Sequence, residues 1–194
     1  MKVYFVRHGQ SEGNISGRHN AWSQVPLTEQ GRLDAAMAGR MLKGISFDKV
    51  YTSDLIRAIE TKEIAMPGVE HEVLPMLREV CVGHLLGRKI EDCAAEYGEI
   101  YFTNRWNTDF SPYGGESREE LHQRIREFLS MLEKTDYENV AVFGHGTYCH
   151  CIFSAITGLF YDSTQLPCHN GSVSVFEFKN GIWRLEAWNC REFA

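Results

Sequence analysis

The sequence predicts an α/β fold: a three-layer αβα sandwich in which helices cover both faces of a mostly parallel sheet of about six strands. Short apolar runs alternate with longer segments whose apolar residues recur every three or four positions. The last two apolar runs are separated only by Lys179, Asn180 and Gly181, which is typical of a hairpin. At 194 residues the chain has the length of one domain, so we expect a single domain over residues 1–194.

The expected elements follow from these runs. Strands are predicted near residues 2–6, 48–52, 71–74, 139–143, 173–178 and 182–188. Helices are predicted over residues 29–43, 55–66, 90–97, 117–134 and 147–157. In the helix over 117–134, apolar side chains recur at three- and four-residue steps, namely Leu121, Ile125, Phe128 and Leu132.

Two of the predicted strands end in a histidine. His8, preceded by Arg7, follows the apolar run 3–6, and His145 follows the run 140–143. Strand ends in an α/β protein fix a side chain while the next loop leaves it accessible. Neutral imidazole is a nucleophile, and the guanidinium fork matches phosphate oxygens. Either histidine alone is equally consistent with an unrelated turn residue, but together they indicate attack on, or capture of, a phosphoryl group.

Arg57 is predicted in the first turn of the helix that begins near residue 55. Ser53 or Asp54 is expected to cap that helix, because each side chain can accept from an N-terminal N–H group. A helix N-terminus favours an anion rather than a cation, and a bound phosphate would reconcile Arg57 with this position. The alternative is a solvent-facing arginine paired with Glu60 or Asp54.

Glu79 is the candidate proton donor. It follows the apolar pair Met76 and Leu77, which places it at a strand or loop end facing the expected pocket. Expelling an alkoxide from a phosphate ester is faster when a nearby acid protonates the leaving oxygen. The alternative interpretation is a solvated glutamate beside Arg78.

These segments resemble the landmarks of the histidine phosphatase superfamily, in the branch similar to cofactor-dependent phosphoglycerate mutase. Six landmarks occur in order along nearly the whole chain: Arg7–Asn14, Pro26–Thr28 with Gly31, Ser53–Ala58 with Thr61, Leu77–Glu79 with Gly83 and Gly87, Gly114–Ser117, and Gly144–Gly146. The resemblance implies a phosphomonoesterase that hydrolyses a small phosphorylated metabolite through a phosphohistidine, without a cofactor or metal. The alternatives are a phosphoglycerate mutase and a non-catalytic phosphate-binding module. The chain looks shorter than the mutases, which favours the phosphatase.

The resemblance also implies roles for individual residues. His8 is the expected nucleophile, and its second ring nitrogen should donate to a backbone carbonyl. Glu79 is the expected acid. The expected phosphate-binding residues are Arg7, Asn14, Arg57, His145 and Gly146.

Some positions depart from the family pattern. Leu85 and Leu86 occupy places where a tryptophan and a glutamate are common, and Gln24 stands where an aspartate is common. We expect these changes to make the rim of the cleft less polar, which leaves the identity of the substrate open.

Residues 83–115 read as an inserted cap segment within the single histidine-phosphatase-like domain. Six aromatic residues are spread among its polar residues: Tyr97, Tyr101, Phe102, Trp106, Phe110 and Tyr113. They are expected either to face the substrate or to form the small core of two short helices, with at least one ring facing the cleft.

The composition of the chain limits the classes of molecule that it is expected to bind. The net charge of −6 gives no overall attraction to nucleic acid or to an anionic membrane, so phosphate capture requires a local basic pocket. No apolar run reaches the ~20 residues of a membrane span. The six cysteines lack zinc-type spacing and read as free thiols. With no secretory segment at the start, we expect a cytoplasmic protein, a monomer or a homodimer.

Overall fold

The computed structural model describes residues 1–159 and 166–192. Its strands are β1 (Lys2–Arg7), β2 (Lys49–Thr52), β3 (Glu72–Val73), β4 (Asn139–Gly144), β5 (Val173–Lys179) and β6 (Ile182–Cys190). Its α-helices are α1 (Glu12–Ile15), α2 (Glu29–Leu42), α3 (Ile56–Ala65), α4 (Ile90–Tyr97), α5 (Glu99–Trp106), α6 (Arg118–Leu132) and α7 (Gly146–Thr157). Short 3₁₀ helices are η1 (Pro75–Leu77), η2 (Gly83–Leu85) and η3 (Ser111–Tyr113).

The strands form one six-stranded sheet in the order β3-β2-β4-β1-β5-β6. β1, β2, β3 and β4 run parallel to one another, whereas β5 is antiparallel to both β1 and β6. The predicted terminal hairpin is confirmed, since Lys179 pairs with Ile182 across a two-residue turn. Both turn residues, Asn180 and Gly181, have positive φ, as a type I′ hairpin turn requires. The mostly parallel sheet predicted from the sequence is therefore confirmed.

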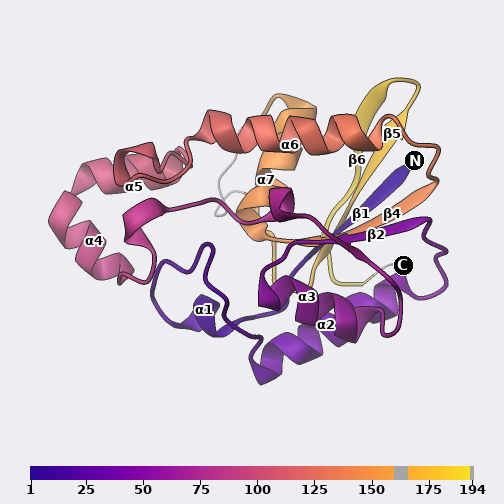
Figure 1. Ribbon diagram of the computed structural model, residues 1–194, viewed down its shortest axis with the longest axis horizontal. Coiled ribbons are helices and arrows are strands. Elements are labelled where there is room, and N and C mark those ends of the chain that lie inside the picture. The colour runs from indigo at the N-terminus through magenta and orange to yellow at the C-terminus, as the bar shows by residue number, and fades with distance from the viewer. Residues whose placement is uncertain (160–165, 193–194) are drawn as a thin grey trace.

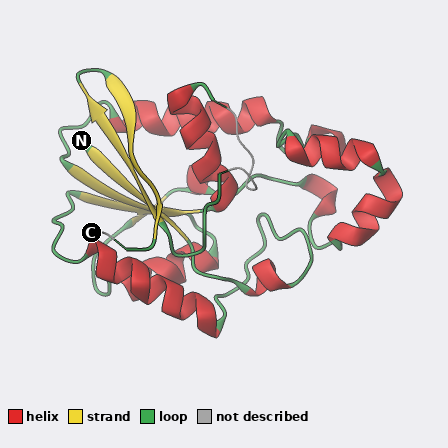
Figure 2. Ribbon diagram, turned by 180° about the vertical axis from the view of Figure 1, so that it is seen from behind, coloured by secondary structure: helices red, strands yellow, loops and turns green. Residues whose placement is uncertain are grey.

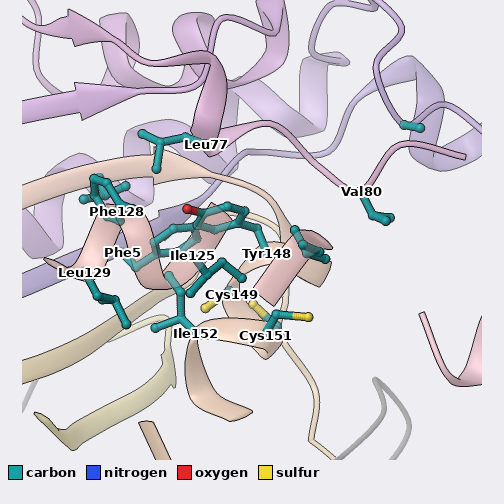
Figure 3. Packing of buried hydrophobic residues seen from close by; sticks show 14 of the residues in the cluster. Phe5, Leu77, Val80, Ile125, Phe128, Leu129, Tyr148, Cys149, Cys151 and Ile152 are labelled. Atoms are coloured by element: carbon teal, nitrogen blue, oxygen red, sulfur yellow. The ribbon is translucent and has the colours of Figure 1, made fainter. Parts of the chain in front are cut away.

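Helices cover both faces of the sheet, with α6 and α7 on one side and α2 and α3 on the other (Figures 1 and 2). Successive side chains of β1 point to opposite faces of the sheet, so the strand contributes to the core on both sides. Phe5 packs with Ile125, Phe128 and Tyr148, in the cluster shown in Figure 3. Its neighbour Val6 points to the opposite face, in the cluster that includes residues of α2. The three-layer αβα sandwich is thus confirmed.

The segment between η2 and η3 extends away from the sheet as the helix pair α4 and α5 (Figure 1). Helix α5 was not among the helices predicted from the pattern. Gly98 separates it from α4 with φ 59° and ψ −142°, a conformation that glycine adopts readily. Tyr101 is buried, whereas Phe102 and Trp106 on the same helix are about half exposed. The aromatic residues of this segment therefore divide between a local core and an accessible surface.

The predicted cap of α3 is wrong. The N-cap position is Leu55, and neither Ser53 nor Asp54 caps the helix through its side chain. The Asp54 carboxylate instead accepts two hydrogen bonds from Arg78 Nε, at 2.8 and 3.0 Å. Ile56 N–H donates to Gln24 Oε1 at 2.9 Å, so a glutamine from a distant loop satisfies the free end of the helix.

The cysteines are all free thiols, as the sequence analysis predicts, and four of them are buried: Cys93, Cys149, Cys151 and Cys168. Among residues 1–159 and 166–192, no three or more histidine, cysteine, aspartate or glutamate side chains are grouped to hold a metal ion. In that same part of the chain, every helix is too short or too polar to cross a membrane.

Candidate active site

The candidate site lies where three neighbouring parallel strands end. Arg7 of β1 is aligned with Gly144 of β4, and Thr52 of β2 is aligned with Phe143 of β4. The chain therefore delivers His8 and His145 to one edge of the sheet, as expected for the carboxyl ends of adjacent parallel strands. The centroids of the two imidazole rings are 5.2 Å apart.

His8 is buried and held in one tautomer. Its Nδ1 lies 2.7 Å from the carbonyl oxygen of Gly9, and because a carbonyl only accepts, Nδ1 carries the hydrogen. Nε2 is left with its lone pair, toward which Arg57 Nε donates at 3.2 Å. Burial lowers the pKa of His8 well below its ordinary value of 6.5, and the guanidinium groups of Arg57 and Arg7 lower it further. The ring is therefore neutral at neutral pH.

The loop that follows His8 is fixed by its backbone. Gly9 N–H donates to Thr61 Oγ1 at 3.0 Å, and Gln10 N–H donates to Asp34 Oδ2 at 3.0 Å. Gly9 also lies against the start of α2, where a Cβ would come within 2.1 Å of the Gly31 carbonyl oxygen. Glycine is thus required at residue 9 for close packing on α2.

His145 is fully buried and has one ring nitrogen free. Its Nε2 lies 2.9 Å from Ser53 Oγ, whereas Nδ1 has no hydrogen-bond partner among the described residues. Ser53 Oγ already accepts from Leu55 N–H at 3.3 Å, so its hydroxyl hydrogen can donate to Nε2. Nδ1 then carries the ring hydrogen. Burial lowers the pKa of His145 well below its ordinary value of 6.5. Electrostatic interaction with Arg57 and then with His8 lowers this pKa further.

Arg57 is almost fully buried, and its guanidinium turns inward. Its terminal nitrogens donate to the carbonyl oxygens of Ser23, at 2.9 Å, and Ala21, at 2.7 Å. The alternative of a surface arginine paired with Glu60 or Asp54 is therefore wrong, because those carboxylates bind other partners. Burial lowers the pKa of Arg57 to about 10.

Arg7 supplies a second unsatisfied donor. One terminal nitrogen donates to the carbonyl oxygen of Cys168, but its buried Nε has no partner within the described part of the chain. Gly146 leaves room for this side chain, since a Cβ there would lie 3.1 Å from Arg7 Nε. A buried N–H without a partner is costly, which makes Arg7 Nε and His145 Nδ1 candidate donors to an anion.

Glu79 reaches the same region from the segment after η1. Its Oε2 accepts from Thr147 N–H at 3.1 Å, in the first turn of α7, and its Oε1 accepts from Val80 N–H at 3.0 Å. Arg78 binds Asp54 instead, so the alternative of a solvated glutamate beside Arg78 is wrong. Glu79 faces the cavity together with Arg7, His8 and Arg57.

Asn14 stands at the entrance with its amide nitrogen available. Its Oδ1 accepts from Ser11 N–H at 2.9 Å and from Asn170 Nδ2 at 3.2 Å. The NH₂ end is consequently the one that can face a ligand, and Asn14 lines the cavity.

The cavity has a volume of about 620 Å³ and extends from His8 to α5. Its wall includes residues that the sequence analysis did not single out, among them Arg18, His19, Arg105 and His150. Arg18 and His19 follow the first landmark closely, but nothing in their spacing shows that they face the same space as α5. The expectation that at least one cap aromatic faces the cleft is met by Phe102, Trp106 and Phe110.

The departures from the family pattern lie elsewhere than expected. Leu85 is fully buried in the core, and Gln24 binds the start of α3. Neither side chain belongs to the cavity wall, and neither does Leu86. The expectation that these residues make the rim less polar is therefore wrong.

Solved structures share this fold along almost the whole chain. A putative alpha-ribazole-5′-P phosphatase from Escherichia coli superposes with a TM-score of 0.87 at 25% identity, covering 100% of this chain and 98% of that one. YhfR from Bacillus stearothermophilus superposes with a TM-score of 0.87 at 27% identity, covering 97% of this chain and 96% of that one.

Curated relatives are more similar in sequence. The adenosylcobalamin/alpha-ribazole phosphatase of Salmonella typhimurium is 32% identical over 198 residues, which span 98% of this chain and 97% of that protein. The probable phosphoglycerate mutase GpmB of Cronobacter sakazakii is 31% identical over 196 residues, which span 97% of this chain and 90% of that protein. The family profile that matches residues 3–191 is the histidine phosphatase superfamily (branch 1). With this match over nearly its full length and the strand-end histidines in place, the chain belongs to the histidine phosphatase superfamily.

Proposed function

We propose that this chain is a phosphomonoesterase that hydrolyses a small phosphorylated metabolite through a phosphohistidine on His8. The observation that carries the proposal is a pair of buried donors without a partner among the described residues, Arg7 Nε and His145 Nδ1, beside a neutral His8 whose Nε2 lone pair faces Arg57 Nε. The relatives support a phosphoryl-transfer reaction, since their names describe phosphatases or mutases. In the proposal, arginine and histidine side chains provide the positive charge that stabilises the phosphoryl group, and no cofactor or metal takes part.

In the proposed complex, the phosphoryl oxygens accept from the cationic and neutral donors of the site. Arg7 Nε and His145 Nδ1 supply two N–H groups that no other described residue binds. Arg57 Nε turns from His8 to a phosphoryl oxygen, which frees the lone pair of His8 for attack. Asn14 adds its amide N–H at the entrance. These donors stabilise the charge that develops on the equatorial oxygens in the transition state.

The proposed reaction has two steps. His8 Nε2 forms a bond to phosphorus as the ester P–O bond breaks, and Glu79 gives a proton to the departing oxygen. Glu79 then takes a proton from a water molecule that attacks the phosphohistidine, which releases inorganic phosphate and restores His8. The hydrogen bond from Thr147 N–H to Glu79 Oε2 orients the carboxyl group at the start of α7.

We also propose that residues 83–115 act as a cap within a single domain. The segment carries α4 and α5, and its Phe102, Arg105 and Trp106 form the cavity wall away from His8. The organic part of the substrate would rest against these rings, while the phosphate occupies the histidine end.

A phosphoglycerate mutase is the second candidate, favoured by the similarity to the GpmB protein. In that case the phosphoryl group passes from His8 to a hydroxyl of a second substrate rather than to water. A phosphate-binding module without turnover is the third. The nucleophile, acid and phosphate-binding residues are all present, which favours an enzyme.

A phosphoenzyme measurement separates these candidates. We expect 4-nitrophenyl phosphate to give a covalent phosphoenzyme that is labile to acid, and the His8→Ala variant to give neither phosphoenzyme nor turnover. His71→Ala is the matched control, because His71 lies outside the cavity and pairs with Glu63 at 3.6 Å. A panel of phosphorylated metabolites that includes 3-phosphoglycerate then shows whether water or a substrate hydroxyl accepts the group. Substantial turnover by His8→Ala would exclude the proposal.

A further inference from the structure

Glu79 lies on a segment without regular structure. Residues 78–82 lie between the 3₁₀ helices η1 and η2 and belong to neither a helix nor a strand. Such backbone has no ladder of hydrogen bonds to hold it, so its carbonyl groups need other partners. Whatever satisfies them also fixes where the Glu79 carboxyl group sits relative to the phosphate.

The Glu79 carbonyl oxygen accepts a hydrogen bond from Trp22 Nε1 at 2.7 Å, and further hydrogen bonds to the carbonyls of this region come from Arg124 of α6. Its NH1 donates to the carbonyl oxygens of Met76 at 2.6 Å and Arg78 at 2.8 Å, and its NH2 donates to that of Glu79 at 3.4 Å. Nε and NH2 also donate to the two carboxylate oxygens of Glu116, at 3.0 and 2.9 Å. A guanidinium has five N–H donors, and all five are used here.

Glu116 holds the other end of the same segment. Its Oε2 accepts from Cys81 N–H at 2.7 Å, and its own backbone N–H donates to the Cys81 carbonyl oxygen at 2.9 Å. The neighbouring Gly115 permits this approach, since a Cβ there would come within 2.3 Å of the Cys81 carbonyl oxygen. Glu79 therefore lies between a backbone clamped by Arg124 on one side and by Glu116 on the other.

The pair acts from outside the cavity. Neither Arg124 nor Glu116 lines it, and the side chain of each is 16% exposed. The Arg124 guanidinium also lies 5.4 Å from the ring centroid of Tyr148 in α7, the helix whose Thr147 N–H binds the Glu79 carboxylate. One ion pair thus links the backbone of Glu79 to the helix that orients its side chain.

We infer that Arg124, braced by Glu116, is a positioning residue that sets the Glu79 carboxyl group at the distance needed to protonate the leaving oxygen. The inference rests on the proposed role of Glu79 as the acid. A displacement of about 1 Å can cost about 10²-fold in rate even when the mutated residue is remote from the chemistry. Lysine cannot replace Arg124, because its ammonium has three donors and no planar fork.

The test measures the Arg124→Lys and Glu79→Gln variants with two substrates. An alkyl phosphate has a poor leaving group and needs the acid, whereas 4-nitrophenyl phosphate has a good one and does not. We expect the rate of phosphoenzyme formation of both variants to fall by about 10²-fold with the alkyl phosphate and by only about threefold with 4-nitrophenyl phosphate. A merely structural role of Arg124 would lower both rates alike.

Arg126→Gln is the matched control, because Arg126 lies on the same helix, is exposed and pairs with Glu119 at 2.5 Å. Glu116→Gln is nearly isosteric and gives a second, milder test that should show the same substrate dependence if Arg124→Lys is poorly folded. An equal loss on both substrates, or no loss, in the Arg124 and Glu116 variants overturns the inference. Failure of Glu79→Gln itself to discriminate between the substrates instead overturns the proposed acid.

Discussion

Arg57 has two functions at one position. Two nitrogens of its guanidinium are bound by the carbonyl oxygens of Ala21 and Ser23, and the third faces His8. The side chain therefore fixes a loop at the cavity and presents one N–H group to His8, the proposed nucleophile. Because the group is almost completely buried, its charge is weakly screened by solvent.

We expect Arg57→Lys to lower kcat/KM for 4-nitrophenyl phosphate by about 10² to 10³, the usual cost of losing a donor to a developing oxyanion. A lysine ammonium cannot bind both loop carbonyls and a phosphoryl oxygen in the same planar arrangement. Steady-state kinetics measure the effect. Arg32→Lys serves as the control, since Arg32 is exposed and lies 3.7 Å from Glu60. A change of threefold or less in Arg57→Lys would show that the guanidinium is dispensable.

At this scale the sequence indicates the residue types but not their partners. His8, Arg57 and His145 could be singled out because they stand at strand or helix ends, and the family resemblance, rather than position alone, implied their roles. The carbonyl oxygens of Ala21 and Ser23 could not be foreseen, because a backbone acceptor in an irregular loop leaves no trace in residue identity. The same holds for the carbonyls bound by Arg124.

Helix α5 is the element that gives the cavity its outer wall. Phe102 and Trp106 are four residues apart and therefore share one face of the helix, whereas Tyr101 turns into the core. The two rings remain about half exposed although they are large and apolar. Such exposure is expected of rings that are covered when a ligand binds.

We expect Trp106→Ala to raise KM about tenfold for phosphate esters with a large organic group, through the loss of about 1.4 kcal/mol of ring contact. The inhibition constant of inorganic phosphate should not change, because phosphate has no organic part to meet the ring. Ile100→Ala is the control: Ile100 is exposed on the same helix and does not line the cavity. An equal effect on phosphate and on the esters would contradict the assignment.

The elements were predictable to different degrees. All six strands and five helices were placed from their apolar pattern, because most of them have a face packed on a core; the two residues of β3 are exposed and form the edge of the sheet. Helix α1, with four residues, is too short to show a period. Helix α5 packs mainly within the cap, so the pattern that burial against a sheet imposes is weak there.

The molecule as a whole is acidic, yet its cavity is basic. Four arginines line it, namely Arg7, Arg18, Arg57 and Arg105, against the single carboxylate of Glu79 among the described wall residues. The sequence predicts such a local basic pocket from the net charge of −6 and the expected anionic ligand. The pocket's two outer arginines could not be foreseen, since the fold brings them there from separate segments.

Three buried histidines make stability depend on pH. The pKa values of His8 and His145 lie well below 6.5, chiefly through burial and then through Arg57, and burial lowers the pKa of His19 to about 4. Below about pH 6.5 these histidines bind protons in the unfolded chain, whereas in the folded chain they stay neutral. The free energy of unfolding should therefore fall as the pH drops below about 6.5, by roughly 1.4 kcal/mol per pH unit for each histidine. For His19 this fall ends near pH 4, where the folded protein also binds the proton.

Urea denaturation in phosphate-free buffer measures this dependence between about pH 7 and about pH 5. His19→Phe removes one of the titrating groups, so its stability should change less steeply with pH than that of the parent chain. Greater stability in acid than at neutral pH would show that these imidazoles are charged in the folded protein.

The position of β1 in the sheet has a consequence for biosynthesis. β1 lies between β4 and β5, which follow it in the chain by more than 130 and 160 residues and are therefore translated much later. Until they emerge, the apolar residues of β1 have no neighbours with which to pair, and the nascent polypeptide must be kept from aggregating. The residues of the proposed site can consequently come together only after β4 and β5 have been synthesised.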